Sequence, residues 1–208
     1  MAAVGRDNYS GMDNEKVDGL VFSSNFDSGN LLGAERAKDG AWELTIAKDC
    51  EGTEYEKRSS TWFYFRVRDE RASELSIAKR EKRGARFRFT GVSRQGALYK
   101  NGMRPVVRKL IDKTAAGGDD CWADMRGDGG WKRLPTPVCY REQRDRTGDL
   151  QFDWNFGAAD EEVEFAFCYP YAYAESLATH AAVLASVRRP PLSSSSRERT
   201  KNVALSLA

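Results

Sequence analysis

Residues 61–67 read TWFYFRV and form the stretch that decides the fold. In an extended strand, successive side chains point to opposite faces. Trp62, Tyr64 and Arg66 would then share one face, and Phe63 and Phe65 would share the other with the valine that ends the stretch. Because aromatic residues occur on both faces, the stretch predicts a central strand between two layers.

Similar short segments occur along the chain on both sides of this strand. They alternate apolar with polar residues or are bounded by turn signals, as is typical of half-buried strands. They lie at 21–31, 42–46, 85–92, 104–110, 150–156 and 163–167. Since no helical pattern is interleaved with them, we expect an all-β fold, an antiparallel β-sandwich with one C-terminal helix and disordered tails.

The same pattern predicts four regions along the chain. Residues 1–19 are rich in Gly, Asn and Asp and predict a disordered N-terminal segment. The β-sandwich takes up 20–173, and the helix formers of 174–189, which precede two prolines, predict a linking helix. The Ser-rich segment 190–208 predicts a disordered tail.

Composition excludes several classes of partner and location. The 208 residues carry 33 basic and 31 acidic side chains, a net charge of +2, which does not favour nucleic-acid binding. No apolar run approaches the length of a membrane span, and the polar N-terminus does not resemble a secretory signal. We therefore expect a cytoplasmic protein with reduced thiols and with neither a nucleic-acid nor a membrane partner.

Candidate catalytic and metal-binding residues are few. His180 is the one histidine, and it falls in the predicted helix, where a surface position is the more common role. The four cysteines are widely spaced and form no C-x-x-C pair, which argues against zinc. The sequence therefore predicts no catalytic residue, no metal ligand and no cofactor in this chain.

Three other features leave binding open. The basic cluster from Lys79 to Arg88 could contact an acidic partner or mark an exposed strand entry. Trp122 and Trp131 lie beside Gly-rich loops and could stack on sugars, although most tryptophans in strands are core residues. The loop acids at 117–120 and 127–130 could hold calcium, but their spacing is not that of an EF-hand.

Five motifs in a fixed order resemble the N-terminal domain of the cytosolic carboxypeptidases. These are M14-type metallocarboxypeptidases, tubulin deglutamylase-like enzymes that shorten polyglutamate chains on tubulin and related proteins. The opening FSSNFDSGNL resembles the family pattern F-x-S-x-F-(E/D)-x-G-N-L, and the resemblance covers about residues 20–187. The motifs lie at 22–31, 62–67, 98–106, 150–156 and 165–173, and the segment 131–133 also follows the family order.

The resemblance implies a β-sandwich that precedes an α/β zinc peptidase domain. It places the segment FAFCYPYAY, residues 165–173, at the junction between these two domains. The expected interface with the peptidase domain comprises Phe167, Tyr169, Pro170, Tyr171 and Tyr173. The expected partners are a peptidase domain, in cis or in trans, and tubulin or other proteins with acidic tails.

The chain also departs from the family pattern. Ala172 and Ala174 replace two hydroxyl residues, and the family's H-x-x-E zinc motif and catalytic glutamate have no counterpart here. We therefore expect the chain to be inactive alone, with zinc belonging to the family's catalytic domain, which this chain lacks. The chain is either a truncated form of such an enzyme or a genuine stand-alone domain, and in the latter case it could bind an acidic protein tail or a carbohydrate.

Overall fold

The computed structural model describes seven parts of the chain, and the statements below apply to them. These parts are residues 11–56, 60–70, 83–93, 95–110, 130–144, 147–157 and 162–187. The chain divides into two compact units, Met1–Pro170 and Tyr171–Ala208, which are considered separately here.

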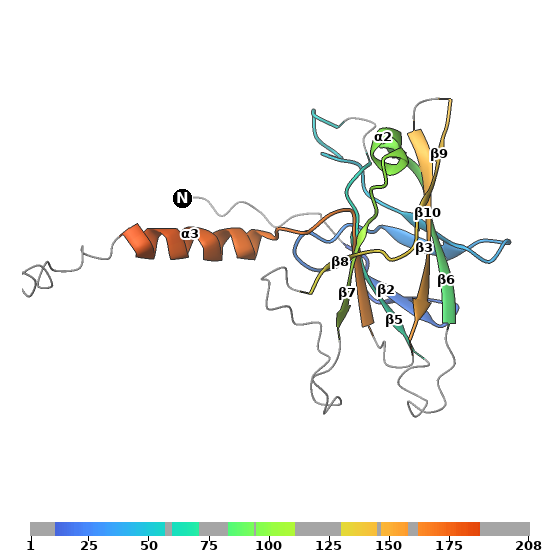
Figure 1. Cartoon of the computed structure of the whole chain (residues 1–208), viewed down its shortest axis with the longest axis horizontal. Coiled ribbons are helices and arrows are strands. Elements are labelled where there is room, and N and C mark those ends of the chain that lie inside the picture. The colour runs from blue at the N-terminus through green and yellow to red at the C-terminus, as the bar shows by residue number, and fades with distance from the viewer. Residues whose placement is uncertain are drawn as a thin grey trace, which may run out of the picture. The chain divides into compact units, whose positions relative to one another are not determined.

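The first unit contains eleven strands and one short helix, and the second contains one helix (Figure 1). The strands are β1 (Glu15–Val17), β2 (Leu20–Ser23), β3 (Gly33–Arg36), β4 (Trp42–Thr45), β5 (Tyr64–Asp69), β6 (Arg83–Ser93), β7 (Val106–Leu110), β8 (Lys132–Arg133), β9 (Cys139–Glu142), β10 (Thr147–Phe156) and β11 (Glu162–Ala166). The helices are α2 (Gly96–Lys100) and α3 (Tyr173–Val187).

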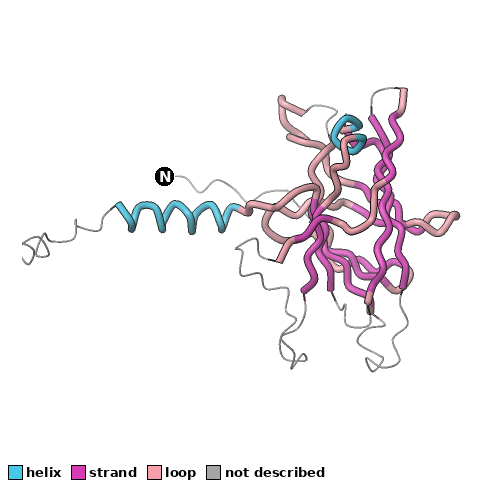
Figure 2. The backbone as a smooth tube through the Cα atoms, viewed as in Figure 1, coloured by secondary structure: helices cyan, strands magenta, loops and turns pink. Residues whose placement is uncertain are grey.

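The strands form two sheets, which confirms the predicted β-sandwich (Figures 1 and 2). The six-stranded sheet has the order β1-β2-β5-β11-β7-β8, and the five-stranded sheet has the order β3-β4-β6-β10-β9. The pairing is antiparallel except between β4 and β6, which are parallel. The exception arises because β5, which lies between β4 and β6 in the sequence, belongs to the other sheet. The chain therefore crosses over through β5, and β6 runs beside β4 in the same direction.

The stretch TWFYFRV lies where the alternation predicted. β5 pairs with β2 on one side and β11 on the other, inside the six-stranded sheet. Phe63 and Phe65 are fully buried between the sheets, and Phe65 stacks on Phe165 with ring centroids 5.4 Å apart. Full burial of a phenylalanine side chain contributes about 2–3 kcal/mol, so this aromatic layer dominates the stability of the sandwich.

Two elements differ from the sequence-based expectations. β1 lies within the segment 1–19, where its Gly-, Asn- and Asp-rich composition predicted disorder; it pairs with β2, and nearby Met12 is buried in the core. The helix α2 forms at 96–100, although the sequence predicts a helix only at 174–189. A five-residue helix is too short to show a period, so tertiary contacts decide its formation.

The second unit contains the predicted helix α3, and none of its residues is buried. None of the helices in the described part of the chain combines the length and the apolar character that crossing a bilayer demands.

Asn30 joins the two sheets through its side chain. Its amide nitrogen donates to the carbonyl oxygens of Trp62 (2.8 Å) and Ala47 (3.3 Å), and its Oδ1 accepts from the amide of Ala47 (2.9 Å). Trp62 lies just before β5, separated from it by Phe63, and Ala47 lies just after β4 of the other sheet. A buried amide that satisfies three backbone groups holds the sheet ends in register.

We expect Asn30→Ala to lower the free energy of unfolding by about 2 kcal/mol, because it leaves buried backbone groups without partners. Urea denaturation followed by tryptophan fluorescence measures the change. The exposed Asn25, which donates to Asp13 at 2.6 Å, provides the control. Equal effects of Asn25→Ala and Asn30→Ala would contradict the role given to Asn30.

Candidate interaction surface

The outer face of the six-stranded sheet carries a row of charged side chains on three neighbouring strands. Glu164 of β11 lies opposite Arg66 of β5 on one side and Arg108 of β7 on the other. Their neighbours along the chain, such as Phe65 and Phe165, point into the core between the sheets. Because side chains alternate along a strand, the three charged residues point away from that core.

Glu164 is a buried carboxylate, although it lies on an outer face. Its side chain is 1% exposed, whereas Arg66 and Arg108 are 34% and 28% exposed. Arg66 Nη2 donates to Oε1 at 2.8 Å, and Arg108 Nε donates to Oε2 at 2.8 Å. An isolated buried charge is very unfavourable, and these two guanidinium groups, one on each oxygen, offset the desolvation of Glu164.

The hydroxyl of Tyr64 completes the environment of Glu164. It donates to Oε2 at 3.2 Å and accepts a hydrogen bond from Arg108 Nη2 at 3.4 Å. Burial, followed by the nearby charge of Glu164, holds the pKa of the Tyr64 phenol well above its ordinary value. Tyr64 therefore stays protonated and remains a donor to the carboxylate.

Aromatic rings surround this ionic group. Arg66 lies 5.0 Å from the ring centre of Phe26, and Arg108 lies 4.8 Å from that of Trp131. The ring of Tyr64 contacts three others: Phe26 at 4.7 Å, Trp131 at 5.5 Å and Trp62 at 6.3 Å. We call this set of residues the Glu164 face: Phe26, Trp62, Tyr64, Arg66, Arg108, Trp131 and Glu164.

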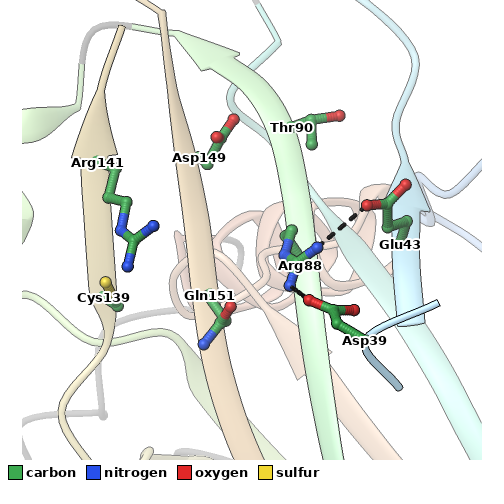
Figure 3. A pocket seen from close by; sticks show the side chains of 8 residues that line it. All are labelled: Asp39, Glu43, Arg88, Thr90, Cys139, Arg141, Asp149 and Gln151. Atoms are coloured by element: carbon green, nitrogen blue, oxygen red, sulfur yellow. Dashed lines mark hydrogen bonds and ion pairs between the residues drawn. The ribbon is translucent and has the colours of Figure 1, made fainter. Parts of the chain in front are cut away.

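The outer face of the five-stranded sheet is different in character (Figure 3). As the alternation in 85–92 predicted, Phe87 and Phe89 point inward, and Arg86 and Arg88 point outward. A hollow of about 410 Å³ lies on this face. The residues that line it are all polar: Asp39, Glu43, Arg88, Thr90, Cys139, Arg141, Asp149 and Gln151.

Arg88 is the central cation of this hollow and already has two acidic partners. It forms ion pairs with Asp39 and, at 3.2 Å, with Glu43 (Figure 3). The hydrogen bond that Arg88 donates to Asp39 holds the pKa of the Asp39 carboxyl below its ordinary value. These groups are partly or fully exposed to water, where ion pairs contribute little. The hollow is therefore a solvated, internally paired surface.

The described ranges contain no grouping suited to a metal. Within them, no three His, Cys, Asp or Glu side chains come together as potential ligands. Cys50, Cys139 and Cys168 are free thiols, and Cys121 lies outside the described residues. His180 is exposed on α3.

The five residues of the expected interface do not come together in one unit. Phe167 packs against the core, with its ring 6.2 Å from that of Phe63, and the exposed Tyr169 lies under Arg133 with 5.4 Å between guanidinium and ring centre. Pro170 ends the first unit. The remaining two, Tyr171 and Tyr173, are exposed and belong to the second unit.

The structure also bears on the other candidates from the sequence. Trp131 is 5% exposed and is therefore a packing residue, not a platform for sugars, while Trp122 lies outside the described residues. In the basic cluster, Arg83 and Arg86 form ion pairs with Asp69 and Asp153, and Arg88 is paired as described above. The described part of that cluster is a paired strand face, whereas residues 79–82 and the loops at 117–120 and 127–129 fall outside the described ranges.

The sequence interpretation missed the Glu164 face. Its signal is a charged residue between apolar neighbours, as in the stretches FRV and VEF around Arg66 and Glu164. Such residues are usually exposed to water on a sandwich surface, so the pattern alone predicts no burial.

Comparison with known proteins points to one family. The family model for the cytosolic carboxypeptidase N-terminal domain matches residues 22–106. Cytosolic carboxypeptidase-like protein 5 of Danio rerio is 30% identical over 186 residues, which are 77% of this chain and 17% of that protein. Cytosolic carboxypeptidase 2 of Homo sapiens is 30% identical over 163 residues, 75% of this chain and 15% of that protein. Among solved structures, a putative carboxypeptidase from Burkholderia mallei aligns with a TM-score of 0.47 and 21% identity, covering 83% of this chain and 33% of that one.

The first unit is thus a two-sheet β-sandwich with a mixed aromatic and ionic outer face. The chain carries an N-terminal domain of the cytosolic carboxypeptidase family. It spans about one sixth of the length of the curated relatives it matches.

Proposed function

We propose that this chain is the non-catalytic N-terminal module, or a truncated form, of a cytosolic zinc carboxypeptidase of the protein-deglutamylase type. In this role it packs on a peptidase domain and assists it in the cytoplasm. The observation that carries the proposal is the family match at 22–106, extended by relatives that align with three quarters or more of this chain.

The residues of this chain do not fit the zinc ion that the family implies. The whole sequence has one histidine and no H-x-x-E motif, and the described part brings no set of three potential ligands together. A catalytic zinc site requires three protein ligands with an open position for water. In this proposal zinc and catalysis belong to the peptidase domain, and no step of the reaction is assigned to this chain.

What the module supplies is a rigid body. Phe22, Phe65, Phe87 and Phe165 form a continuous set of ring contacts between the two sheets. A close-packed core of this kind deforms little. The module can therefore hold a neighbouring domain in one position, and we expect the substrates of the assembled enzyme to be tubulin or other proteins with acidic tails.

The alternative of a stand-alone binding module receives no specific support. Trp131 is buried, which disfavours sugar stacking, and the described arginines of the basic cluster already have acidic partners.

We expect the 208-residue chain with added zinc to release no glutamate from a polyglutamate peptide. The physical reason is the lack of a ligand set for a zinc-bound water. Amino-acid analysis of the reaction mixture measures the release, with and without a chelator. Release of glutamate that the chelator abolishes would contradict the non-catalytic role.

A second experiment tests the packing role directly. The chain is co-expressed with human cytosolic carboxypeptidase 2 from which the segment matching this chain has been removed. We expect the two to purify together as a stoichiometric complex. If they never associate, the proposed packing role is wrong.

A further inference from the structure

The two outer faces of the sandwich differ in the chemistry that they present. The Glu164 face presents two arginines and two partly exposed rings, Phe26 and Trp62, which pack around the buried rings of Tyr64 and Trp131. Arg133 and Tyr169 continue it at one end. The 410 Å³ hollow on the five-stranded sheet is lined by polar side chains without any aromatic ring (Figure 3). Aromatic residues and arginine are enriched at the centres of protein interfaces, whereas scattered surface charges are depleted there.

We infer that the Glu164 face is the surface on which the peptidase domain docks. This inference rests on the proposed function and adds to it the face of the module that makes the contact.

The arginines of this face are held in place before any partner arrives. Arg66 and Arg108 each donate to Glu164, and each lies against an aromatic ring. Ordering a long side chain on binding costs conformational entropy, and here most of that entropy is already lost in the free module. The face is therefore pre-organised for a partner.

The charge distribution indicates what the partner must offer. Glu164 is fully covered, while about a third of Arg66 (34%) and of Arg108 (28%) remains exposed. The neighbouring Arg68 of β5 is exposed beside them on the same outer face. Glu162 of β11, which is 31% exposed, pairs with Arg66 at 3.1 Å and lies opposite Arg68, so three arginines face one partly exposed carboxylate. Because donors are in excess, we expect the complementary surface of the docked domain to carry carboxylates or carbonyl oxygens.

The position of the face also suits a domain connected through the end of the sandwich. β11, which carries Glu164, continues into Phe167 and Tyr169, and Pro170 ends the first unit. Tyr169 contacts Arg133 of β8, the strand next to β7. The face therefore extends to the end of the first unit.

Two matched charge reversals test the inference. Arg68→Glu changes an exposed strand residue beside the Glu164 face, and Arg141→Glu changes an exposed strand residue on the opposite outer face. Each full-length variant is titrated by biolayer interferometry against the same truncated human cytosolic carboxypeptidase 2. We expect Arg68→Glu to weaken binding about tenfold and Arg141→Glu to leave it unchanged.

A thermal melt of each variant tests whether it is folded, and Arg133→Glu on β8 replaces Arg68→Glu if that variant is unstable. If the unmodified chain binds but Arg68→Glu and Arg133→Glu do not weaken it, or Arg141→Glu weakens it equally, the docking face is wrong and the proposed function stands. If the unmodified chain does not bind, the proposed function fails and the docking face fails with it.

Discussion

Gly29→Ala is expected to destabilise the sandwich by about 3 kcal/mol or more. A Cβ atom at Gly29 would lie 2.0 Å from the carbonyl oxygen and 2.8 Å from the carbonyl carbon of Ser24. Ser24 is itself held, because its hydroxyl accepts from the amide of Met12 at 2.9 Å and donates to the carbonyl of Leu31 at 2.8 Å. Since the clash is with fixed backbone, no side-chain rotation relieves it.

Gly33→Ala is the matched control for this substitution. An added Cβ at Gly33, at the start of β3, meets no atom within 4 Å. We expect its free energy of unfolding to change by less than about 0.5 kcal/mol. Chemical denaturation of both variants measures the difference, and a Gly29→Ala protein as stable as Gly33→Ala would show that the 22–31 segment adapts more freely than its contacts indicate.

Arg108→Ala is expected to lower the free energy of unfolding by about 3 kcal/mol. The substitution removes the cationic partner of Glu164 Oε2, which keeps its hydrogen bond from the Tyr64 hydroxyl, and leaves a carboxylate that is 1% exposed with Arg66 as its remaining cation. The control is Arg86→Ala, which removes an ion pair with Asp153 in which both side chains are about half exposed. For that exposed pair we expect a loss of at most about 1 kcal/mol.

The double variant Arg108→Ala, Glu164→Gln separates the ionic effect from lost packing. A neutral amide in place of the carboxylate no longer needs the second cation; its oxygen can accept from Arg66, and its NH2 group can donate to the hydroxyl of Tyr64. Thermal and urea unfolding should therefore recover most of the stability lost in Arg108→Ala. If the double variant is no more stable than the single one, the stranded charge is not the cause of the loss.

Much of the fold follows from local alternation. Phe63 and Phe65, Phe87 and Phe89, and the apolar residues of β10 (Leu150, Phe152, Trp154 and Phe156) all point inward as the period of two predicted. The prediction succeeds because successive side chains of a strand alternate between its two faces, so the position of an apolar residue along the chain decides which face it occupies. Burial of the aromatic rings then strongly stabilises one register.

Other features could not be predicted in that way. The parallel pairing of β4 with β6 depends on a crossover through the other sheet, and β1 and α2 are too short to show a period. The candidate site was the least predictable, because a charged residue at an outward position gives the same local pattern whether water or two arginines surround it.

The sequence by itself determined which side chains face the core, and its ordered motifs determined the family of this domain. The tertiary structure alone decided that Glu164 is buried between Arg66 and Arg108, which lie 98 and 56 residues away along the chain. Periodicity is a property of neighbouring residues, whereas the pairing of distant strands depends on the global topology, and a buried ion pair exists only where that pairing brings its members into contact.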